Sequence, residues 1–536
     1  MDAQQQISQI SRRQWITAGA VGGFAGALLM TGLMFFGRFA LETPLIPELM
    51  AERLFALIPL DLFSLGIRLF GLKAKYLAFW GMVSLFILIG GFLGVLFTWL
   101  ARRHWLKTHW RGGLTYGSLL WALFGLVGSP LLGGGLFGAN LEGGLLLSSS
   151  SLLILYGVYG ATLGMLAGRL LRHSRDTLTT AGASVPPLDT SRRAFAKRLL
   201  TGIAAVGSVS ALLHLLDTLT ARSRAFAQDL FQRIKGLPPD LTPNEKFYKI
   251  SKNVFDPKVK VSRWSLELKG LVERPMKLTY SELKALPMKE QYGTLECISN
   301  EVGGDLISNA RWKGIPLGAL LAKAGVKSSA KKVVFRAADG YSTAIPLTKA
   351  MHPDTLLAIE MNGVPLPDDH GFPIRLINPG HYGMKNPKWI TEIELTEQDY
   401  KGYWESRGWS DEARVKTMSR IDAPAHGSRV STHGAETGGI AFAGDRGIRQ
   451  VEVSLDDGLT WQKAVLKPAL GSYAWVLWGL VWEPPPAPAK AGAKHTSSLT
   501  LKVRAIDGSG SIQTAHVTNV LPDGASGYHT IHVTLS

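Results

Sequence analysis

The chemistry available to this chain of 536 residues centres on its single cysteine, Cys297, in the run Thr294-Leu-Glu-Cys-Ile-Ser-Asn-Glu-Val-Gly-Gly304. A thiolate can ligate a soft metal or attack an electrophile, and the residues after Cys297 predict a polar loop that could present it. One cysteine excludes an intramolecular disulfide and a cysteine-rich zinc or iron–sulfur site. A buried structural cysteine is the common alternative. A cysteine hydrolase also stays open, because three histidines could supply its base: His352, His370 and His381.

Two further runs follow the cysteine, Ala358-Ile-Glu-Met-Asn-Gly-Val-Pro-Leu-Pro-Asp-Asp-His-Gly-Phe-Pro-Ile-Arg375 and Leu376-Ile-Asn-Pro-Gly-His-Tyr-Gly-Met-Lys-Asn-Pro-Lys-Trp-Ile390. Together with the cysteine run they resemble the molybdenum-cofactor domain of the sulfite oxidase family. The run Ile448-Arg-Gln-Val-Glu-Val-Ser-Leu-Asp-Asp-Gly-Leu-Thr-Trp461 resembles the immunoglobulin-like dimerisation domain that follows it in that family. The resemblance extends from about Leu241 to the C-terminus. It implies an α+β molybdopterin domain, an all-β sandwich and a molybdopterin-dependent oxidoreductase.

For the site, the resemblance implies a molybdenum held by one pyranopterin dithiolene, by oxygen ligands and by the thiolate of Cys297, which is thus both metal ligand and catalytic residue. A soft thiolate suits such a metal, and the pterin supplies the other sulfurs. The pterin ends in a phosphate, for which Arg375, Lys385 and Lys388 match the family's basic positions, while His370 matches a cofactor-contacting histidine. Solvated surface positions are the ordinary alternative for such residues. The remaining predicted cofactor contacts are Lys252, Asn253, Ser299, Asn300, Asp339, Tyr341 and Tyr382.

The sequence also departs from the sulfite oxidase pattern, in which a metal-contacting tyrosine precedes Glu-Met-Asn-Gly and Ala-Gly-Asn-Arg-Arg follows the cysteine. Here the first position is Ile359, and the second run reads Ile298-Ser-Asn-Glu-Val302, which replaces arginine with Glu301. Arg446 could restore one positive charge. We therefore expect a poor sulfite oxidase that prefers a neutral S-oxide or N-oxide, because an anionic substrate would lose a charge-assisted pair.

The N-terminal third of the chain is apolar enough to lie in a bilayer, which a helix of about 20 residues can cross. Residues 16–36, 77–100, 114–137 and 145–171 predict four spans, and residues 199–216 predict a fifth. Small residues recur within them, as expected where helices pack closely in lipid. Pro59, Asp61 and Arg68 interrupt the apolar stretch 54–72, so we expect that stretch to be an amphipathic segment at the outer interface.

Basic residues predict the orientation of these spans. The formal net charge is +17, and basic residues flank the apolar segments without the stripe of aromatics and cations typical of a nucleic-acid interface. The positive-inside rule places the loop 101–111 in the cytoplasm. Ser191-Arg-Arg-Ala-Phe-Ala-Lys197 resembles the twin-arginine signal that exports proteins folded around a cofactor. We expect a multi-pass protein of the cell membrane whose catalytic domain lies on the outer, extracytoplasmic face.

These patterns predict four parts: a membrane bundle (1–190), a twin-arginine-like segment with the fifth span (191–227), a molybdopterin domain (228–416) and a sandwich (417–536). The expected partners are the bilayer, a small-molecule substrate, a separate electron carrier such as a cytochrome or quinone, and a second copy of the chain. The homodimer rests on the family and on four tryptophans that suit an interface or a core equally: Trp461, Trp475, Trp478 and Trp482. The alternative function is a transporting or electron-conducting bundle that carries a regulatory module. The spans hold almost no ionisable residues, which weighs against it.

Overall fold

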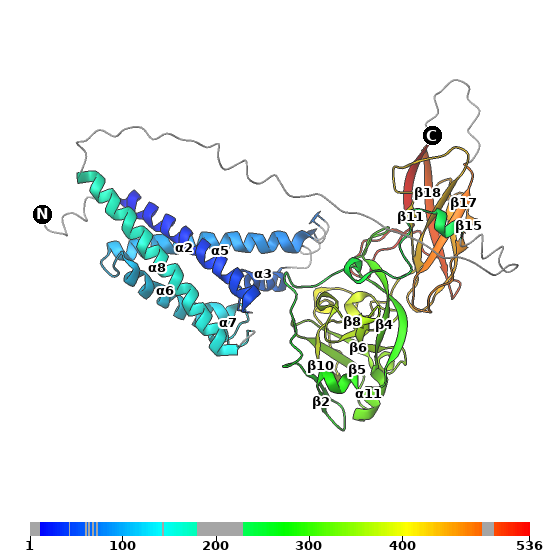
Figure 1. Cartoon of the computed structure of the whole chain (residues 1–536), viewed down its shortest axis with the longest axis horizontal. Helices are drawn as coiled ribbons and strands as arrows, with labels where there is room; N and C mark the ends of the chain where they lie inside the picture. The colour runs from blue at the N-terminus through cyan, green and yellow to red at the C-terminus, as the bar shows by residue number, and fades with distance from the viewer. Residues whose placement is uncertain are drawn as a thin grey trace, which may run out of the picture. The chain divides into compact units, whose positions relative to one another are not determined.

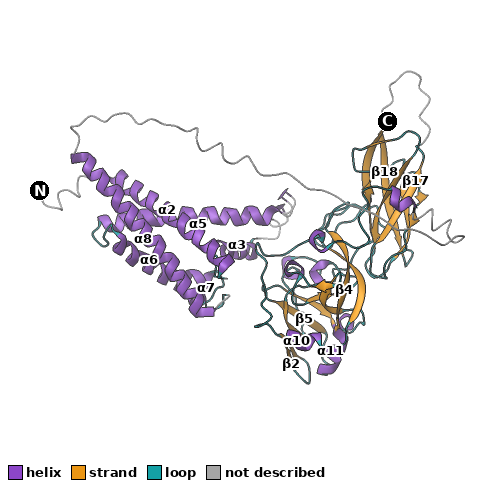
Figure 2. Ribbon diagram, in the orientation of Figure 1, coloured by secondary structure: helices purple, strands orange, loops and turns teal. Residues whose placement is uncertain are grey.

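The computed structural model describes residues 11–179, with short gaps at 42, 59–61, 63–64, 67–68, 71–72 and 142–143, together with residues 229–484 and 498–536. The chain divides into two compact units, Met1–Leu213 and His214–Ser536. The first is helical and the second is built mainly from strands (Figure 2). The predicted twin-arginine run and the predicted fifth span lie outside the described residues.

The N-terminal unit contains the four long apolar segments as helices. Among the residues that the structure describes, four stretches are long and apolar enough to cross a membrane: Arg12–Ala40, Ala74–Arg102, Trp110–Leu131 and Gly144–Arg172. The predicted third span, 114–137, is too long at its end, because a run of glycines with positive φ at Gly133 and Gly135 stops the helix. The α-helices described in this unit are α2 (Arg12–Ala40), α3 (Ile46–Leu57), α5 (Ala74–Arg102), α6 (Trp110–Leu123), α7 (Ser129–Leu131) and α8 (Gly144–Thr179).

Close packing of α2 on α5, and of α6 on α8, depends on glycine (Figure 1). A Cβ at Gly94 would lie 2.2 Å from the carbonyl oxygen of Gly19, and a Cβ at Gly113 would lie 2.0 Å from that of Gly160. No side chain fits at these distances, so the backbones touch, as the small residues predicted. Backbone contact of this kind supplies dispersion attraction between the helices.

The first part of the C-terminal unit is the predicted α+β domain, built on two sheets. One has the order β2 (Met276–Leu278), β1 (Leu266–Gly270), β10 (Ile390–Thr396), β5 (Lys332–Ala337) and β6 (Ser342–Pro346), with β1 and β10 parallel. The other has the order β3 (Lys289–Glu296), β4 (Ile307–Pro316), β7 (Leu356–Met361) and β8 (Val364–Pro365), and β9 (Arg375–Ile377) also pairs with β7. The short helices are α10 (Tyr280–Lys284), α11 (Leu317–Ala324) and α12 (Leu347–Ala350).

Helix α11 shows how the sequence builds the core of this domain. Its buried residues Leu317, Leu320, Leu321 and Ala324 recur at helical spacing and pack with Phe335 of β5 in one hydrophobic cluster. Burying a leucine side chain contributes about 2 kcal/mol. The hydrophobic core therefore fixes the strands, and the site residues extend from the ends of these strands.

The second part is the predicted β-sandwich, with two sheets around one core. The first has the order β11 (Met418–Ala423), β13 (Ala435–Phe442), β17 (Val476–Trp482) and β16 (Val465–Leu466). The second has the order β12 (Arg429–Val430), β19 (His529–Leu535), β18 (Ser498–Asp507), β14 (Ile448–Ser454) and β15 (Gln462–Lys463). Trp475, Trp478 and Trp482 are at most 4% exposed, and only Trp461 is partly exposed among the four tryptophans. Trp478 and Trp482 belong to the sandwich core, Trp475 is buried, and Trp461 keeps an exposed part.

Candidate active site around Cys297

Cys297 directly follows β3 and opens a closed loop that ends at Leu306. The N–H of Cys297 donates to the carbonyl oxygen of Leu306 at 2.9 Å, and the N–H of Leu306 donates to Oδ1 of Asn300 at 3.0 Å. Asn300 also donates from Nδ2 to Oε1 of Glu296 at 3.0 Å. The predicted cofactor contact Asn300 is thus committed to holding the loop shut. Its role is to shape the loop that carries the thiol.

The environment of the thiol suits a metal ligand. Cys297 is 8% exposed, and its Sγ lies 3.0 Å from Oγ of Ser299. Burial raises the pKa of the thiol, whereas the contact with Ser299 lowers it. A bound cation stabilises the thiolate directly and overcomes such a penalty. No three His, Cys, Asp or Glu side chains gather as a metal site in the ranges that the structure describes, so a metal here needs ligands beyond Cys297.

The hydrolase alternative finds no base in the described residues, because no hydrogen bond recorded there joins Cys297 to a histidine. Nε2 of His370 donates to the carbonyl oxygen of Asn244 at 2.7 Å, and Nδ1 of His381 donates to that of Pro379 at 3.3 Å. Burial lowers the pKa of both imidazoles to about 4. Both are therefore neutral rings fixed by backbone carbonyls, and each has its own structural partner.

Gly383 forms a cradle beside the cysteine. A Cβ at Gly383 would lie 2.7 Å from the hydroxyl of Tyr248 and 3.9 Å from Cα of Cys297. The pKa of Tyr248 is raised well above its usual value, first by burial and then by the negative charge of a Cys297 thiolate. The pKa of Tyr341 is raised in the same way, with carboxylates adding to the effect, and its hydroxyl donates to the carbonyl oxygen of Met384 at 2.7 Å. The space that a side chain at Gly383 would fill is thus bordered by the cysteine and a protonated phenol.

Arg375 provides the clearest test of whether an anionic cofactor fits. Its side chain is 5% exposed, it donates to the carbonyl oxygens of His370 and Asn386, and it lies 5.2 Å over the ring of Trp312. Its Nε has no hydrogen-bond partner, and no described carboxylate pairs with it. Burial lowers the pKa of this guanidinium to about 10. A buried cation without a counter-ion is costly, so the site fits the phosphate that the pterin would bring.

A second basic group lies close by. Nζ of Lys388 donates to the carbonyl oxygen of Asp369 at 2.9 Å and lies 3.8 Å from a carboxylate oxygen of Asp256. Burial, together with like-charge repulsion from Arg375, lowers the pKa of this ammonium to about 8. Paired positive charges are tolerated where an anion binds. Lys388 and Arg375 therefore form the candidate phosphate-binding pair.

Lys252, Asn253 and Asp339 are joined in one polar chain. Nζ of Lys252 donates to Oδ1 of Asn253 at 2.7 Å, and Nδ2 of Asn253 donates to Asp339 at 3.1 Å. Asp339 also accepts from the N–H of Tyr341 at 2.9 Å. The structure thus brings these four predicted contacts together. Their neighbour Tyr403, which the sequence did not single out, lies 6.0 Å from Tyr341 and under the Lys252 ammonium.

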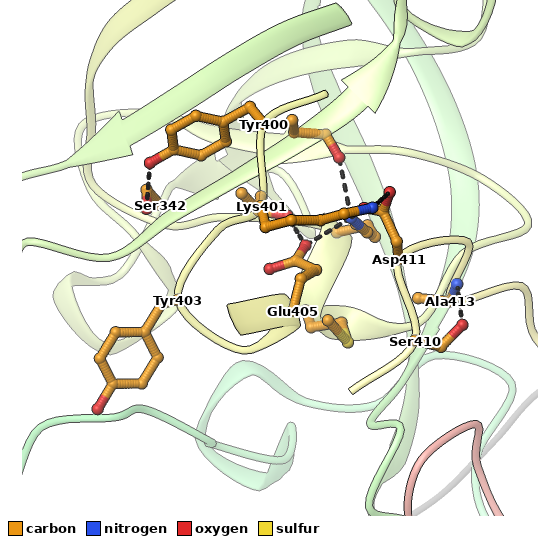
Figure 3. A network of polar contacts seen from close by, with 12 residues as sticks. Ser342, Tyr400, Lys401, Tyr403, Glu405, Ser410, Asp411 and Ala413 are labelled. Carbon is orange, nitrogen blue, oxygen red and sulfur yellow. Dashed lines mark hydrogen bonds and ion pairs between the residues drawn. The ribbon is translucent and has the colours of Figure 1, made fainter. Parts of the chain in front are cut away.

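Lys385 takes a different place from the one predicted. Its ammonium donates to the carbonyl oxygen of Ala344 at 2.9 Å, to Glu405 at 2.5 Å and to Asp411 at 3.1 Å, and the residue is 1% exposed. Figure 3 shows Glu405, Asp411 and Lys401 converging on this network while Tyr403 points away from it. All three ammonium hydrogens are used within the protein. We therefore assign Lys385 to a buried ion-pair network and no longer to the phosphate.

Tyr382 and Asn378 also differ from expectation. The hydroxyl of Tyr382 accepts from the N–H of Lys416 at 3.2 Å, and a Cβ at Gly524 would lie 2.5 Å from it, so Tyr382 faces the sandwich. Asn378 is fully buried, yet neither its Oδ1 nor its Nδ2 has a partner among the described residues. Buried amides are normally satisfied, so Asn378 is a further candidate contact for a polar ligand. Its place in an Asn-Pro-Gly turn gave no signal beyond a turn.

Three residues on which the expected substrate preference depended lie elsewhere. Ile359 is 1% exposed and packs in the hydrophobic cluster that includes Phe335. Glu301 is exposed. Arg446 is ion-paired with Asp507 at 2.9 Å and adds no free charge. The argument from Ile359, Glu301 and Arg446 is therefore wrong in its details, and the lack of an arginine in the cysteine loop is what remains.

Comparison with known proteins identifies both sheet domains. The family model described as the oxidoreductase molybdopterin binding domain matches residues 253–404, and that of the Mo-co oxidoreductase dimerisation domain matches residues 411–536. Mitochondrial sulfite oxidase of Drosophila melanogaster is 30% identical over 54% of this chain and 59% of that protein. The human protein is 32% identical over 56% of this chain and 64% of its own length. The uncharacterized oxidoreductase YuiH of Bacillus subtilis is 35% identical over 28% of this chain and 73% of its own.

These two sulfite oxidases are thus matched over less than two thirds of their own length. Both matches to family models begin after the helical unit.

Proposed function

The chain belongs to the sulfite oxidase family of molybdopterin-dependent oxidoreductases, and we propose that it catalyses oxygen-atom transfer or a related two-electron reaction on a small substrate. The observation that carries the proposal is the buried Arg375, a cation without a carboxylate partner in the described domain that holds Cys297. The molybdenum cofactor would supply the two-electron redox chemistry, with Cys297 as the protein's ligand.

The surrounding residues would bind and orient that cofactor. Arg375 and Lys388 provide charge-assisted donors for its phosphate. His370 keeps its proton on Nε2, because the carbonyl oxygen of Asn244 can only accept, and its Nδ1 is therefore an acceptor. Tyr248 holds its proton at Oη throughout the physiological range, since its pKa is raised. This hydroxyl is thus a hydrogen-bond donor beside the cysteine.

For the substrate we propose a neutral S-oxide or N-oxide. The loop 297–306 contains no arginine or lysine, and the guanidinium that reaches it from the sandwich, Arg420, is paired with Asp422 at 2.7 Å. An anionic substrate would therefore gain little from charge at this loop. Purified protein should contain about one molybdenum per chain by metal analysis and should turn over S-oxides or N-oxides under anaerobic conditions. Sulfite oxidation with a kcat of about 10 s⁻¹ or more would contradict the substrate class.

We further propose that the helical unit anchors the enzyme in the cell membrane, with the catalytic domain outside the cytoplasm. Four helices in the described part of the chain are long and apolar enough to cross a bilayer, and the twin-arginine-like run precedes a further apolar stretch. Electrons would pass to or from a separate cytochrome or quinone. The dimerisation-domain match supports a homodimer.

The export proposal has a direct test. A reporter fused after Ser536 should respond as non-cytoplasmic, and the double change Arg192→Lys with Arg193→Lys should keep it in the cytoplasm. The matched control is Arg12→Lys with Arg13→Lys, which alters the other arginine pair but leaves the run at 191–197 intact. An unchanged reporter in the first variant would reject the twin-arginine interpretation.

A further inference from the structure

The cysteine loop rests on the sandwich through three consecutive residues. Arg420 of β11 donates from Nη1 to the carbonyl oxygen of Gly304 at 2.6 Å. A Cβ at Gly303 would lie 2.3 Å from the ring of His529, at the start of β19. A Cβ at Gly527 would lie 3.7 Å from Cγ2 of Val302. The part of the loop beyond the cysteine is therefore in contact with the second domain of the same chain.

The strand before the cysteine is attached to the same domain. The N–H of Thr294 donates to the carbonyl oxygen of Tyr473 at 2.8 Å, and the N–H of Trp475 donates to Oγ1 of Thr294 at 2.9 Å. Thr294 lies three residues before Cys297, and Gly304 lies seven residues after it. Sandwich contacts therefore bracket the cysteine on both sides along the chain.

Arg420 is itself fixed for this contact. Its side chain is 11% exposed, and Nη2 and Nε both bond Oδ1 of Asp422, at 2.7 and 2.8 Å. Nδ1 of His529 accepts from the N–H of Ile421 at 3.0 Å, which turns the Nε2 side of the ring toward Gly303. Neighbouring residues of one strand thus hold both groups that meet the loop. The guanidinium contact is charge-assisted, and such hydrogen bonds are about twice as strong as neutral ones.

We propose that the sandwich, in addition to the dimerisation role in its family description, positions the cysteine ligand, and that Arg420 is the positioning residue. The proposal rests on the proposed function, in which Cys297 binds the metal. A loop that contains two adjacent glycines has much backbone entropy to lose, so external contacts are needed to hold it in one conformation. A ligand must be held to within about 0.5 Å for a metal site to work.

The experiment measures hydrogen–deuterium exchange of peptides covering residues 297–306 in full-length, detergent-solubilised protein. In Arg420→Met we expect these amides to exchange about tenfold faster, because the loop opens locally. Arg420→Lys keeps the positive charge but loses the bidentate geometry of the guanidinium. Its loop exchange rate should lie between that of the unmodified protein and that of Arg420→Met. The matched control is Arg504→Met, which removes a similar sandwich pair, with Glu452 at 2.7 Å, and no bond recorded among the described residues joins Arg504 to residues 297–306.

A second readout uses the metal. In the holoenzyme, electron paramagnetic resonance of the molybdenum should be broadened in Arg420→Met and unchanged in Arg504→Met. Gly303→Ala, which pushes His529 away from the loop, should speed exchange of the loop amides as much as Arg420→Met does. Combining Gly303→Ala with Arg420→Met should add little to that increase.

Two outcomes would overturn the proposal. One is loop exchange in Arg420→Met equal to that in Arg504→Met. The other is faster exchange spread evenly over the whole sandwich, which would make Arg420 a stabiliser of that domain alone. The exchange experiment needs neither bound metal nor turnover. Protein without molybdenum would thus reject the proposed function and still report whether Arg420 holds the loop.

Discussion

Replacing Cys297 with serine should reduce redox turnover by more than about 100-fold. Changing a residue that only contacts a metal ligand costs up to about 100-fold, and this change removes the ligand itself. The hydroxyl of serine is a hard, weakly acidic group that cannot replace a soft thiolate at the metal. The phosphate contacts of Arg375 and Lys388 are untouched, so the pterin should remain bound in part. Turnover with the best substrate of the panel and the molybdenum content of the same sample provide the measurement.

The control for this variant is Ser281→Ala, an exposed change in α10 that touches no site residue. It should leave turnover and metal content as in the unmodified protein. Full activity in Cys297→Ser would remove the thiolate from the mechanism and with it the assignment of the site.

Replacing Lys385 with methionine should lower the free energy of unfolding of the C-terminal unit by about 3–5 kcal/mol. The ammonium is enclosed with the carboxylates of Glu405 and Asp411, and the side chains of Lys385 and Glu405 are each 1% exposed. Without Lys385, Glu405 keeps only the hydroxyl of Thr343 at 2.6 Å among its recorded partners and leaves a charge buried. Urea unfolding followed by tryptophan fluorescence measures the loss.

Adding Glu405→Gln to Lys385→Met should recover part of the lost stability, because the orphaned charge is then gone. The exposed pair of Lys502 with Asp457 serves as the control, and Lys502→Met should cost less than about 1 kcal/mol. The two interpretations of Lys385 also separate here. If Lys385 binds the phosphate, as the sequence predicted, Lys385→Met should lose cofactor while its stability stays normal. If Lys385 belongs to a structural ion pair, the variant should lose stability first.

Local sequence was enough for much of this protein. The apolar stretches predicted the four long helices, because length and hydropathy decide a span without reference to distant residues. The family runs predicted both sheet domains and supplied the candidate site residues Cys297, His370, Arg375 and Lys388. Cys297 stood out in the sequence because it is the single thiol of the chain.

Only the tertiary structure decided which partner each buried polar group meets. Lys385 was indistinguishable from Lys388 in the sequence until Glu405, twenty positions on, was placed against it. Ile359 looked like a site position in the sequence. In the structure it lies in β7, and because side chains alternate between the two faces of a strand, it points into the hydrophobic core. Arg420 contacts Gly304 across 116 positions. A buried charge must find a counter-ion or donor wherever the fold supplies one, and that choice is made by long-range packing, which no local pattern encodes.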